Sequence, residues 1–224
     1  MNRNRVCIFI GEGISERYFL PSLLQNQLGF KPLFPKVDHL YTKDGKIFWL
    51  LPFPPKSTTP IGGKARLFNI QTYKDCCAMH AGNSHLFGNH LVDYRILIDS
   101  DGGSIEKRKK QVARVQRSFK KGGRLVNSCQ ILFVENEIEN WYFAGLTARF
   151  PYFKVNEPRV TRLLAERPEQ IIEPKDKLAS ILDFDSRNDA IKLAQVVGEY
   201  FDIERAIQRS PSFKAFYKSL AQLI

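Results

Sequence analysis

Three short, mostly apolar runs limit the folds open to this chain. They lie at residues 6–10, 94–98 and 130–134. Runs of about five residues with few polar side chains are typical of strands that are buried on both faces of a sheet. Segments with helical spacing follow the strands. This alternation over residues 6–145 predicts an α/β fold, with a mostly parallel sheet flanked by helices.

The rest of the chain departs from that alternation. Residues 29–92 are rich in Pro, Gly and Lys, with a hairpin expected around residues 43–46 and loop from residue 50. After about residue 150 strand patterns stop, and helices are expected to begin at Pro158, Pro174 and Pro211. We therefore predict an α/β domain at residues 1–150, an insertion of unassigned structure at 29–92 and a helical C-terminal extension at 151–224.

The chain carries an excess of positive charge. Its 224 residues include 34 Lys and Arg against 23 Asp and Glu, a net charge of +11. Most of this excess lies in residues 104–124, which hold nine basic residues and one acid. Such a segment favours a polyanion, and nucleic acid above all. A solvated charged face and an acidic protein partner are the alternatives. The predicted contacts to the nucleic-acid backbone, spaced along one helical face, are Lys107, Lys110, Arg114 and Arg117.

No segment is typical of a membrane span or a signal peptide. The apolar runs are far shorter than the ~20 residues that cross a bilayer. The basic start of the chain is not followed by the apolar core of a signal peptide. The four cysteines fit neither a disulfide framework nor a standard zinc motif. We therefore expect a cytoplasmic protein that has no membrane partner.

Carboxylates follow each of the three predicted strands. Because ligands bind at the carboxyl ends of the strands in open α/β sheets, these acids are expected to converge at one edge. Converging carboxylates repel each other unless a cation neutralises them, and oxygen ligands without matched His or Cys favour Mg²⁺ or Mn²⁺. The alternative, that they are solvated turn residues, is weaker for three motifs than for one. In chain order they are Glu12, Glu16, Asp99, Asp101, Glu135, Glu137 and Glu139.

Two of these segments resemble a known domain. Phe-Ile-Gly-Glu-Gly-Ile-Ser-Glu at residues 9–16 and Ile-Leu-Ile-Asp-Ser-Asp at 96–101 resemble the Toprim domain of topoisomerases, primases and nucleases of the overcoming-lysogenisation-defect type. Val-Glu-Asn-Glu-Ile-Glu-Asn-Trp-Tyr-Phe-Ala at 134–144 is similar to a small stand-alone bacterial Toprim family, often encoded beside ATPases and linked to defence against phage. This chain departs from the pattern at Gly11, where an apolar residue is commoner, and at Glu16, where nucleases often have Asp.

The resemblance implies a metal-dependent nuclease acting on DNA or RNA. It assigns Glu12, Asp99 and Asp101 as catalytic residues and ligands of the principal metal. A second metal would be held by Glu16 with either Glu137 or Glu139. In such a mechanism one Mg²⁺ activates a water and the other stabilises the leaving oxygen.

The resemblance also implies partners. They are nucleic acid and an ATPase supplied in trans within an antiviral defence system, and a homo-oligomer is left open. The alternative is a non-catalytic, Toprim-like regulatory or binding subunit of an ATPase complex. A third reading is another Mg²⁺-dependent phosphoryl-transfer enzyme that acts on nucleotides.

Overall fold

The computed structural model describes most of the predicted α/β region and of the extension. The described residues are 4–11, 13–33, 40–52, 90–100, 126–155, 157–186 and 188–222, with the single positions 106, 109, 110, 113 and 117. Some of the predictions lie outside these residues: the site residues Glu12 and Asp101 and the basic residues Lys107 and Arg114.

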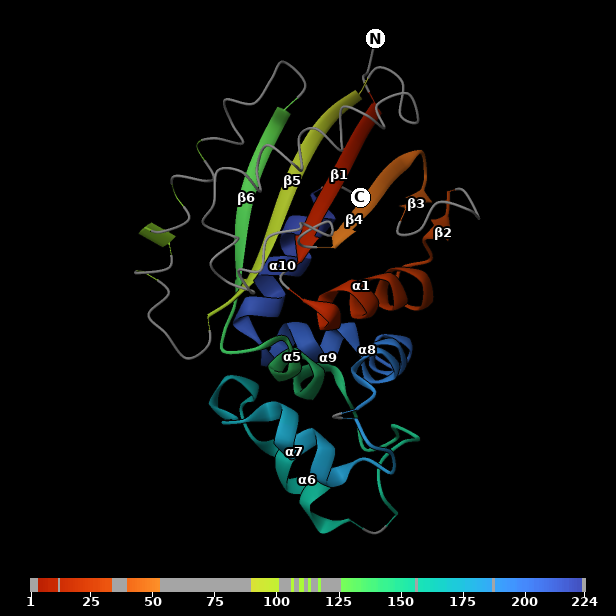
Figure 1. Cartoon of the computed structure of the whole chain (residues 1–224), viewed down its shortest axis with the longest axis vertical. Helices are drawn as coiled ribbons and strands as arrows, with labels where there is room; N and C mark the ends of the chain where they lie inside the picture. The colour runs from red at the N-terminus through yellow and green to blue at the C-terminus, as the bar shows by residue number, and fades with distance from the viewer. Residues whose placement is uncertain are drawn as a thin grey trace.

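A six-stranded, mostly parallel sheet lies at the centre of the molecule (Figure 1). Its order is β2-β3-β4-β1-β5-β6. β1 pairs in parallel with both β4 and β5, and β5 pairs in parallel with β6, whereas β2 and β3 add an antiparallel edge. The predicted α/β class is therefore confirmed. The strands are β1 (Asn4–Gly11), β2 (Lys31–Pro32), β3 (Leu40–Lys43), β4 (Lys46–Pro52), β5 (His90–Asp99) and β6 (Val126–Val134).

Part of the predicted insertion belongs to the sheet. The expected hairpin joins β3 to β4 through Asp44 and Gly45, whose φ angles of 50° and 74° are both left-handed. Two such residues form the tight turn whose twist matches antiparallel strands. The loop expected from residue 50 is wrong for its first residues, because β4 continues to Pro52 beside β1.

β5 is longer than its apolar run predicts. Residues 80–92 are expected to form a turn-rich link, but the strand already begins at His90. The polar side chain of Asp93 is fully buried, and it accepts hydrogen bonds from Asn127 Nδ2 at 2.8 Å and from Ser128 Oγ on β6. A buried polar group is tolerated when it is hydrogen-bonded. Hydrogen bonds from β6 therefore allow Asp93 to lie inside a buried strand, which the hydropathy pattern does not predict.

The helices pack against one face and one end of the sheet. In Figure 1 the carboxyl ends of β1, β5 and β6 point towards α5, and α6 and α7 lie beyond it. None of the described helices is both long and apolar enough to cross a membrane. The helices are α1 (Ile14–Asn26), α5 (Ile138–Gly145), α6 (Pro158–Ala165), the 3₁₀ turn η2 (Pro168–Gln170), α7 (Pro174–Ile181), α8 (Ala190–Glu199), α9 (Ile203–Arg209) and α10 (Pro211–Ala221).

The helix starts confirm most of the sequence signals. Pro158, Pro174 and Pro211 each occupy the first position of a helix, where the missing N–H of proline costs no hydrogen bond. Serine is a favourable N-cap residue, so the sequence predicts that Ser15 caps α1, but this prediction is wrong. Gly13 takes that place and Ser15 lies within the first turn. This shift frees the Ser15 hydroxyl for a contact with α5.

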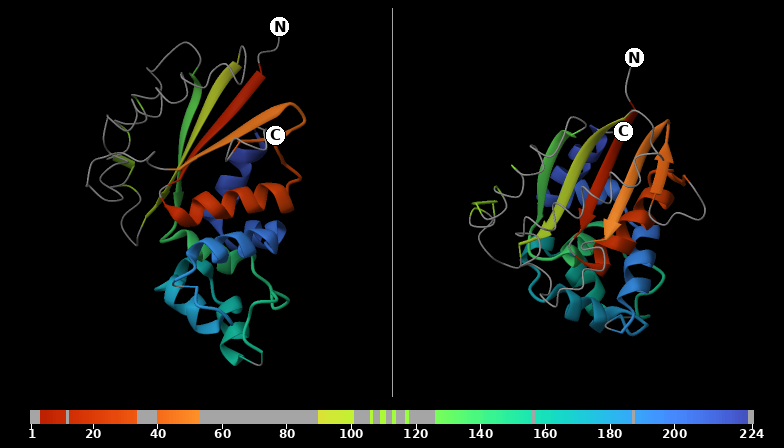
Figure 2. Two further views of the ribbon diagram at one scale, coloured as in Figure 1. Left: turned by 45° about the vertical axis from the view of Figure 1, so that its right-hand side comes forward. Right: turned by 45° about the horizontal axis from the view of Figure 1, so that its top comes forward.

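One aromatic core joins the sheet to the C-terminal helices. The ring centroid of Phe216 on α10 lies 5.7 Å from that of Phe9 on β1 and 5.1 Å from that of Trp141 on α5, with both ring pairs tilted. Trp141, Tyr142 and Phe143 are all fully buried, so this aromatic run belongs to the core. Figure 2 shows the dark-blue α10 against the sheet, where it packs on β6 and α9, while α1 packs on α8. The predicted boundary near residue 150 stays a prediction, and packing across it is extensive.

Candidate functional site

The carboxyl ends of three neighbouring parallel strands meet at one edge of the sheet. The β1–β5 register runs to Ile10 opposite Ile96, and the β5–β6 register runs to Asp99 opposite Val134. Asp99 is thus the last residue of β5, and β6 leads directly into the acids that begin α5. The parallel arrangement of β1, β5 and β6 is therefore confirmed. The expected convergence of the described strand-end acids depends on it.

Hydrogen bonds hold the loops after β5 and β6 together. Ser100 donates its N–H to the carbonyl of Val134 at 2.9 Å, and its hydroxyl accepts from the N–H of Asn136 at 2.8 Å. Asn136 has a left-handed φ of 64°, a conformation that Asn adopts more readily than most residues. The loops carrying Asp99 and Glu137 are therefore fixed relative to each other.

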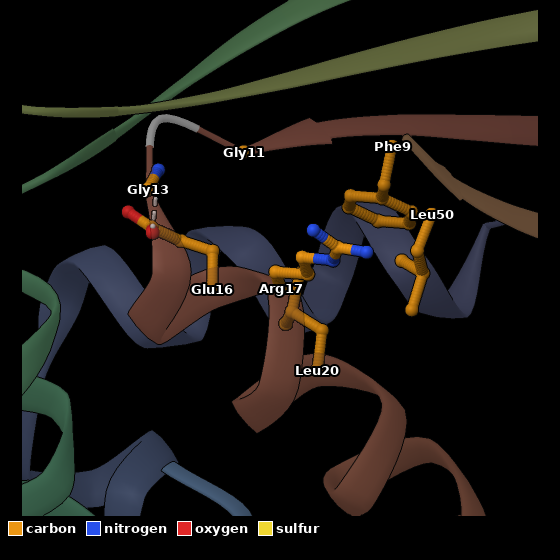
Figure 3. A pocket seen from close by; sticks show the side chains of 7 residues that line it. All are labelled: Phe9, Gly11, Gly13, Glu16, Arg17, Leu20 and Leu50. Carbon is orange, nitrogen blue, oxygen red and sulfur yellow. Dashed lines mark hydrogen bonds between the residues drawn. The ribbon is translucent and has the colours of Figure 1, made fainter. Parts of the chain in front are cut away.

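Glu16 lies buried against the end of β1. Its Oε2 accepts the N–H of Gly13 at 2.9 Å, and the residue is only 3% exposed. A Cβ at Gly11 would lie 2.7 Å from the Cβ of Glu16, closer than real Cβ contacts. Figure 3 shows Glu16 beside Gly13 at the start of α1, with Arg17 directed towards Phe9. The departure from the Toprim pattern at Gly11 thus has a steric reason.

Substituting Gly11 by Ala is expected to displace Glu16. Forcing a methyl group into this contact should cost about 1–3 kcal/mol of unfolding free energy. If Glu16 serves the reaction, its misplacement should also slow cleavage about tenfold to a hundredfold. The measurement is a double-mutant cycle with Glu16→Gln. We expect Gly11→Ala to slow cleavage by almost nothing in a chain that already carries Glu16→Gln. Fully additive losses of cleavage rate would contradict the role of Glu16.

Glu139 places a buried carboxylate in the first turn of α5. The residue is 2% exposed, and its Oε1 accepts the Ser15 hydroxyl at 2.9 Å. Its Oε2 is also buried and has no hydrogen-bond partner among the residues that the structure describes. A buried carboxylate oxygen in this state is costly unless a proton or a cation compensates it. Glu139 is therefore a described acid whose burial calls for a positive partner.

Lys175, on α7 of the C-terminal extension, brings a positive charge to the acid cluster formed by Glu16, Asp99, Glu137 and Glu139. Its Nζ lies 3.6 Å from Glu137 Oε2 and 3.9 Å from Glu139 Oε1. The segment before α7 is held by Asn140, whose side-chain amide donates to the carbonyls of Pro168 and, at 3.0 Å, of Ile171. The charge and hydropathy patterns give Lys175 no role in the site, because a lysine in the first turn of an amphipathic helix is ordinary.

The electrostatics show that four predicted acids act on the same ammonium. Partial burial works to lower the pKa of Lys175, but the surrounding negative charges outweigh it and the pKa is raised. The carboxylates responsible are Glu139, Glu137, Asp99 and Glu16, in order of effect. Burial also raises the pKa of Tyr142 well above its usual value, and Glu139, Glu16 and Asp99 add to this. The cluster therefore gathers acids from three strand–helix junctions.

The pKa of Glu139 gives the stability a pH dependence with a defined sign. Burial raises this pKa above 4.5, the charge of Glu137 adds to it, and Lys175 and the Ser15 hydroxyl oppose it. The neutral form is therefore favoured in the folded state, and the associated stability is lost as the pH rises from 4.5 through the folded pKa. In EDTA, wild type should lose unfolding free energy relative to Glu139→Gln between pH 4.5 and 7. Urea unfolding at a series of pH values measures the two unfolding free energies. A difference between wild type and Glu139→Gln that stays constant across this pH range would contradict the prediction.

The other predicted site residues divide into two groups. Lys110 and Arg117 are exposed, as contacts to a nucleic-acid backbone must be. Glu12, Asp101, Lys107 and Arg114 lie outside the described residues. Within the part of the chain that the structure describes, no three His, Cys, Asp or Glu side chains are grouped closely enough to hold a metal ion. The described acids thus form an incomplete ligand set in which Glu12 and Asp101 have no described position.

Comparison with known proteins identifies no relative. No family model matches the chain, and no similar curated protein or solved structure is found. A functional proposal for this protein therefore depends on the residues and geometry of the site and on the resemblance in its motifs.

Proposed function

We propose that this protein is a metal-dependent nuclease that hydrolyses phosphodiester bonds of DNA or RNA. The observation that carries the proposal is the gathering of Glu16, Asp99, Glu137 and Glu139 around Lys175. Acids that share one sheet edge, with a buried oxygen on Glu139 that lacks a hydrogen-bond partner among the described residues, suit an oxygen-binding cation. The Toprim-like motifs support the same reading.

The donor set suits Mg²⁺ or Mn²⁺ and no softer metal. Carboxylate oxygens are the ligands that these hard ions prefer. When bound, such an ion supplies an activated water and neutralises charge on the scissile phosphate. Glu16 and Asp99 would hold it with Glu12 and Asp101, while the Ser15 hydroxyl orients Glu139. Lys175, whose ammonium is partly exposed, would face the substrate phosphate.

The positive charge of the chain provides the affinity for substrate. Lys110 and Arg117 are exposed in the segment that carries most of the +11 net charge, and Lys107 and Arg114 belong to the same predicted track. Contacts of this kind bind the phosphate backbone without reading its sequence. The proposal includes a cytoplasmic location, expected from the sequence, and an ATPase partner in an antiviral system, which only the resemblance in the motifs implies.

The test is cleavage by the purified full chain. Plasmid, single-stranded DNA and RNA are incubated with Mg²⁺, Mn²⁺ or EDTA, alone and with an ATPase encoded beside the gene. We expect metal-dependent cleavage that an Asp99→Ala/Asp101→Ala variant loses and that Glu204→Gln, an exposed carboxylate on α9, retains. Nucleic-acid binding with no cleavage in any mixture would overturn the nuclease and favour the regulatory subunit. Release of products from free nucleotides alone would favour a nucleotide-processing phosphoryl-transfer enzyme.

A further inference from the structure

The position of Lys175 has a consequence for the number of metal ions. Its ammonium lies between Glu137 and Glu139, at 3.6 and 3.9 Å from their oxygens. These are the two acids between which the sequence leaves open the last ligand of a second metal. An ammonium and a divalent cation that share the same carboxylates repel each other. Lys175 and a second metal therefore compete for the same place.

The two oxygens of Glu139 face different surroundings. Oε1 receives the Ser15 hydroxyl and lies towards Lys175, whereas Oε2 is buried without a hydrogen-bond partner among the described residues. A carboxylate arranged in this way can offer one oxygen to a metal while the other faces a fixed positive group. The side of the cluster towards Lys175 is thus already neutralised, and the opposite side is not.

Lys175 already supplies one positive charge on this side of the acids. A second divalent ion bound between Glu137 and Glu139 would have to displace its ammonium. The backbone before Lys175 is anchored, since Asn140 binds the 168–171 segment and Pro174 begins α7 next to it. The Lys175 side chain itself is 61% exposed and reaches the two acids through its charge.

We propose that Lys175 takes the place of the second cation, so that this site binds one divalent ion per chain. This inference rests on the proposed function, because it assumes that the acids bind a metal. In place of the two metal ions expected from the sequence, the site would contain one Mg²⁺ or Mn²⁺ ion and the ammonium of Lys175. The divalent ion and the ammonium would then lie on opposite sides of the Glu139 carboxylate.

The experiment counts bound Mn²⁺ by the loss of its free electron paramagnetic resonance signal during titration of the full chain. The variants are Lys175→Met, which keeps the aliphatic stem, and Lys175→Arg, which keeps the charge. Lys177→Met is the matched control, because Lys177 lies on the same helix but its Nζ lies 4.0 Å from Glu166, outside the cluster. Circular dichroism verifies that each variant is folded.

We expect one bound ion in wild type, Lys175→Arg and Lys177→Met, and two in Lys175→Met. Two ions in wild type, or one ion with unchanged affinity in Lys175→Met, would overturn the inference and leave the nuclease proposal intact. No bound ion in wild type, or one that Asp99→Asn fails to weaken, would instead overturn the metal site on which the proposed function depends. If Lys175→Met fails to fold, two ions in Lys175→Gln support the inference and one overturns it.

Discussion

Glu139→Gln is expected to reduce metal-dependent cleavage by at least about a hundredfold, because it removes a buried negative charge that a bound cation would compensate. Glutamine has nearly the same shape, and its carbonyl can still accept the Ser15 hydroxyl that now binds Oε1 at 2.9 Å. The change therefore removes charge with little change in packing. Single-turnover cleavage across a range of Mg²⁺ concentrations measures the effect, which should include weaker metal dependence as well as a lower maximal rate.

Two controls separate this effect from a general loss of structure. Ser15→Ala removes the hydroxyl that orients Glu139 but leaves the charge, so a smaller loss of about tenfold is expected. Glu204→Gln changes an exposed carboxylate on α9 and should leave cleavage unchanged. If Glu139→Gln cleaves within about threefold of wild type at every Mg²⁺ concentration, Glu139 is not a metal ligand.

Gly198→Ala should destabilise the protein by about 3 kcal/mol, although alanine is ordinarily the better helix former. Gly198 lies on α8 where this helix crosses α1. A Cβ there would lie 2.6 Å from the Cβ of Ser22, 2.8 Å from the carbonyl oxygen of Phe19 and 2.9 Å from the nitrogen of Leu23. Two of these are backbone atoms of a helix and cannot rotate away. The interface must therefore open to admit the methyl group.

Denaturant unfolding provides the measurement, with Gln195→Ala as the matched control on the same helix. Gln195 is exposed, and only its backbone carbonyl is used in the interface, where it accepts the Ser22 hydroxyl at 2.6 Å. We expect its substitution to change the unfolding free energy by less than about 0.5 kcal/mol. Equal effects of the two substitutions would show that α1 and α8 are less closely packed than the structure indicates.

Local patterns predicted the main elements because those elements depend on local physics. A run of apolar residues forms a buried strand wherever it lies, and proline at Pro158, Pro174 and Pro211 begins a helix because of its own ring. The predictions were wrong where a distant residue decided the outcome. β5 extends back to His90 because Asn127 and Ser128 satisfy the buried Asp93, and neither residue is near it in the chain.

The same division applies to the candidate site. The order of strands and acids along the chain determined that Glu16, Asp99, Glu137 and Glu139 would share one sheet edge, since parallel strands end on the same side. Only the tertiary structure decided that Lys175 joins them and that the two oxygens of Glu139 differ. The physical reason is that an ion pair depends on where α7 packs, and this packing is set by hydrogen bonds from Asn140 to a segment far along the chain.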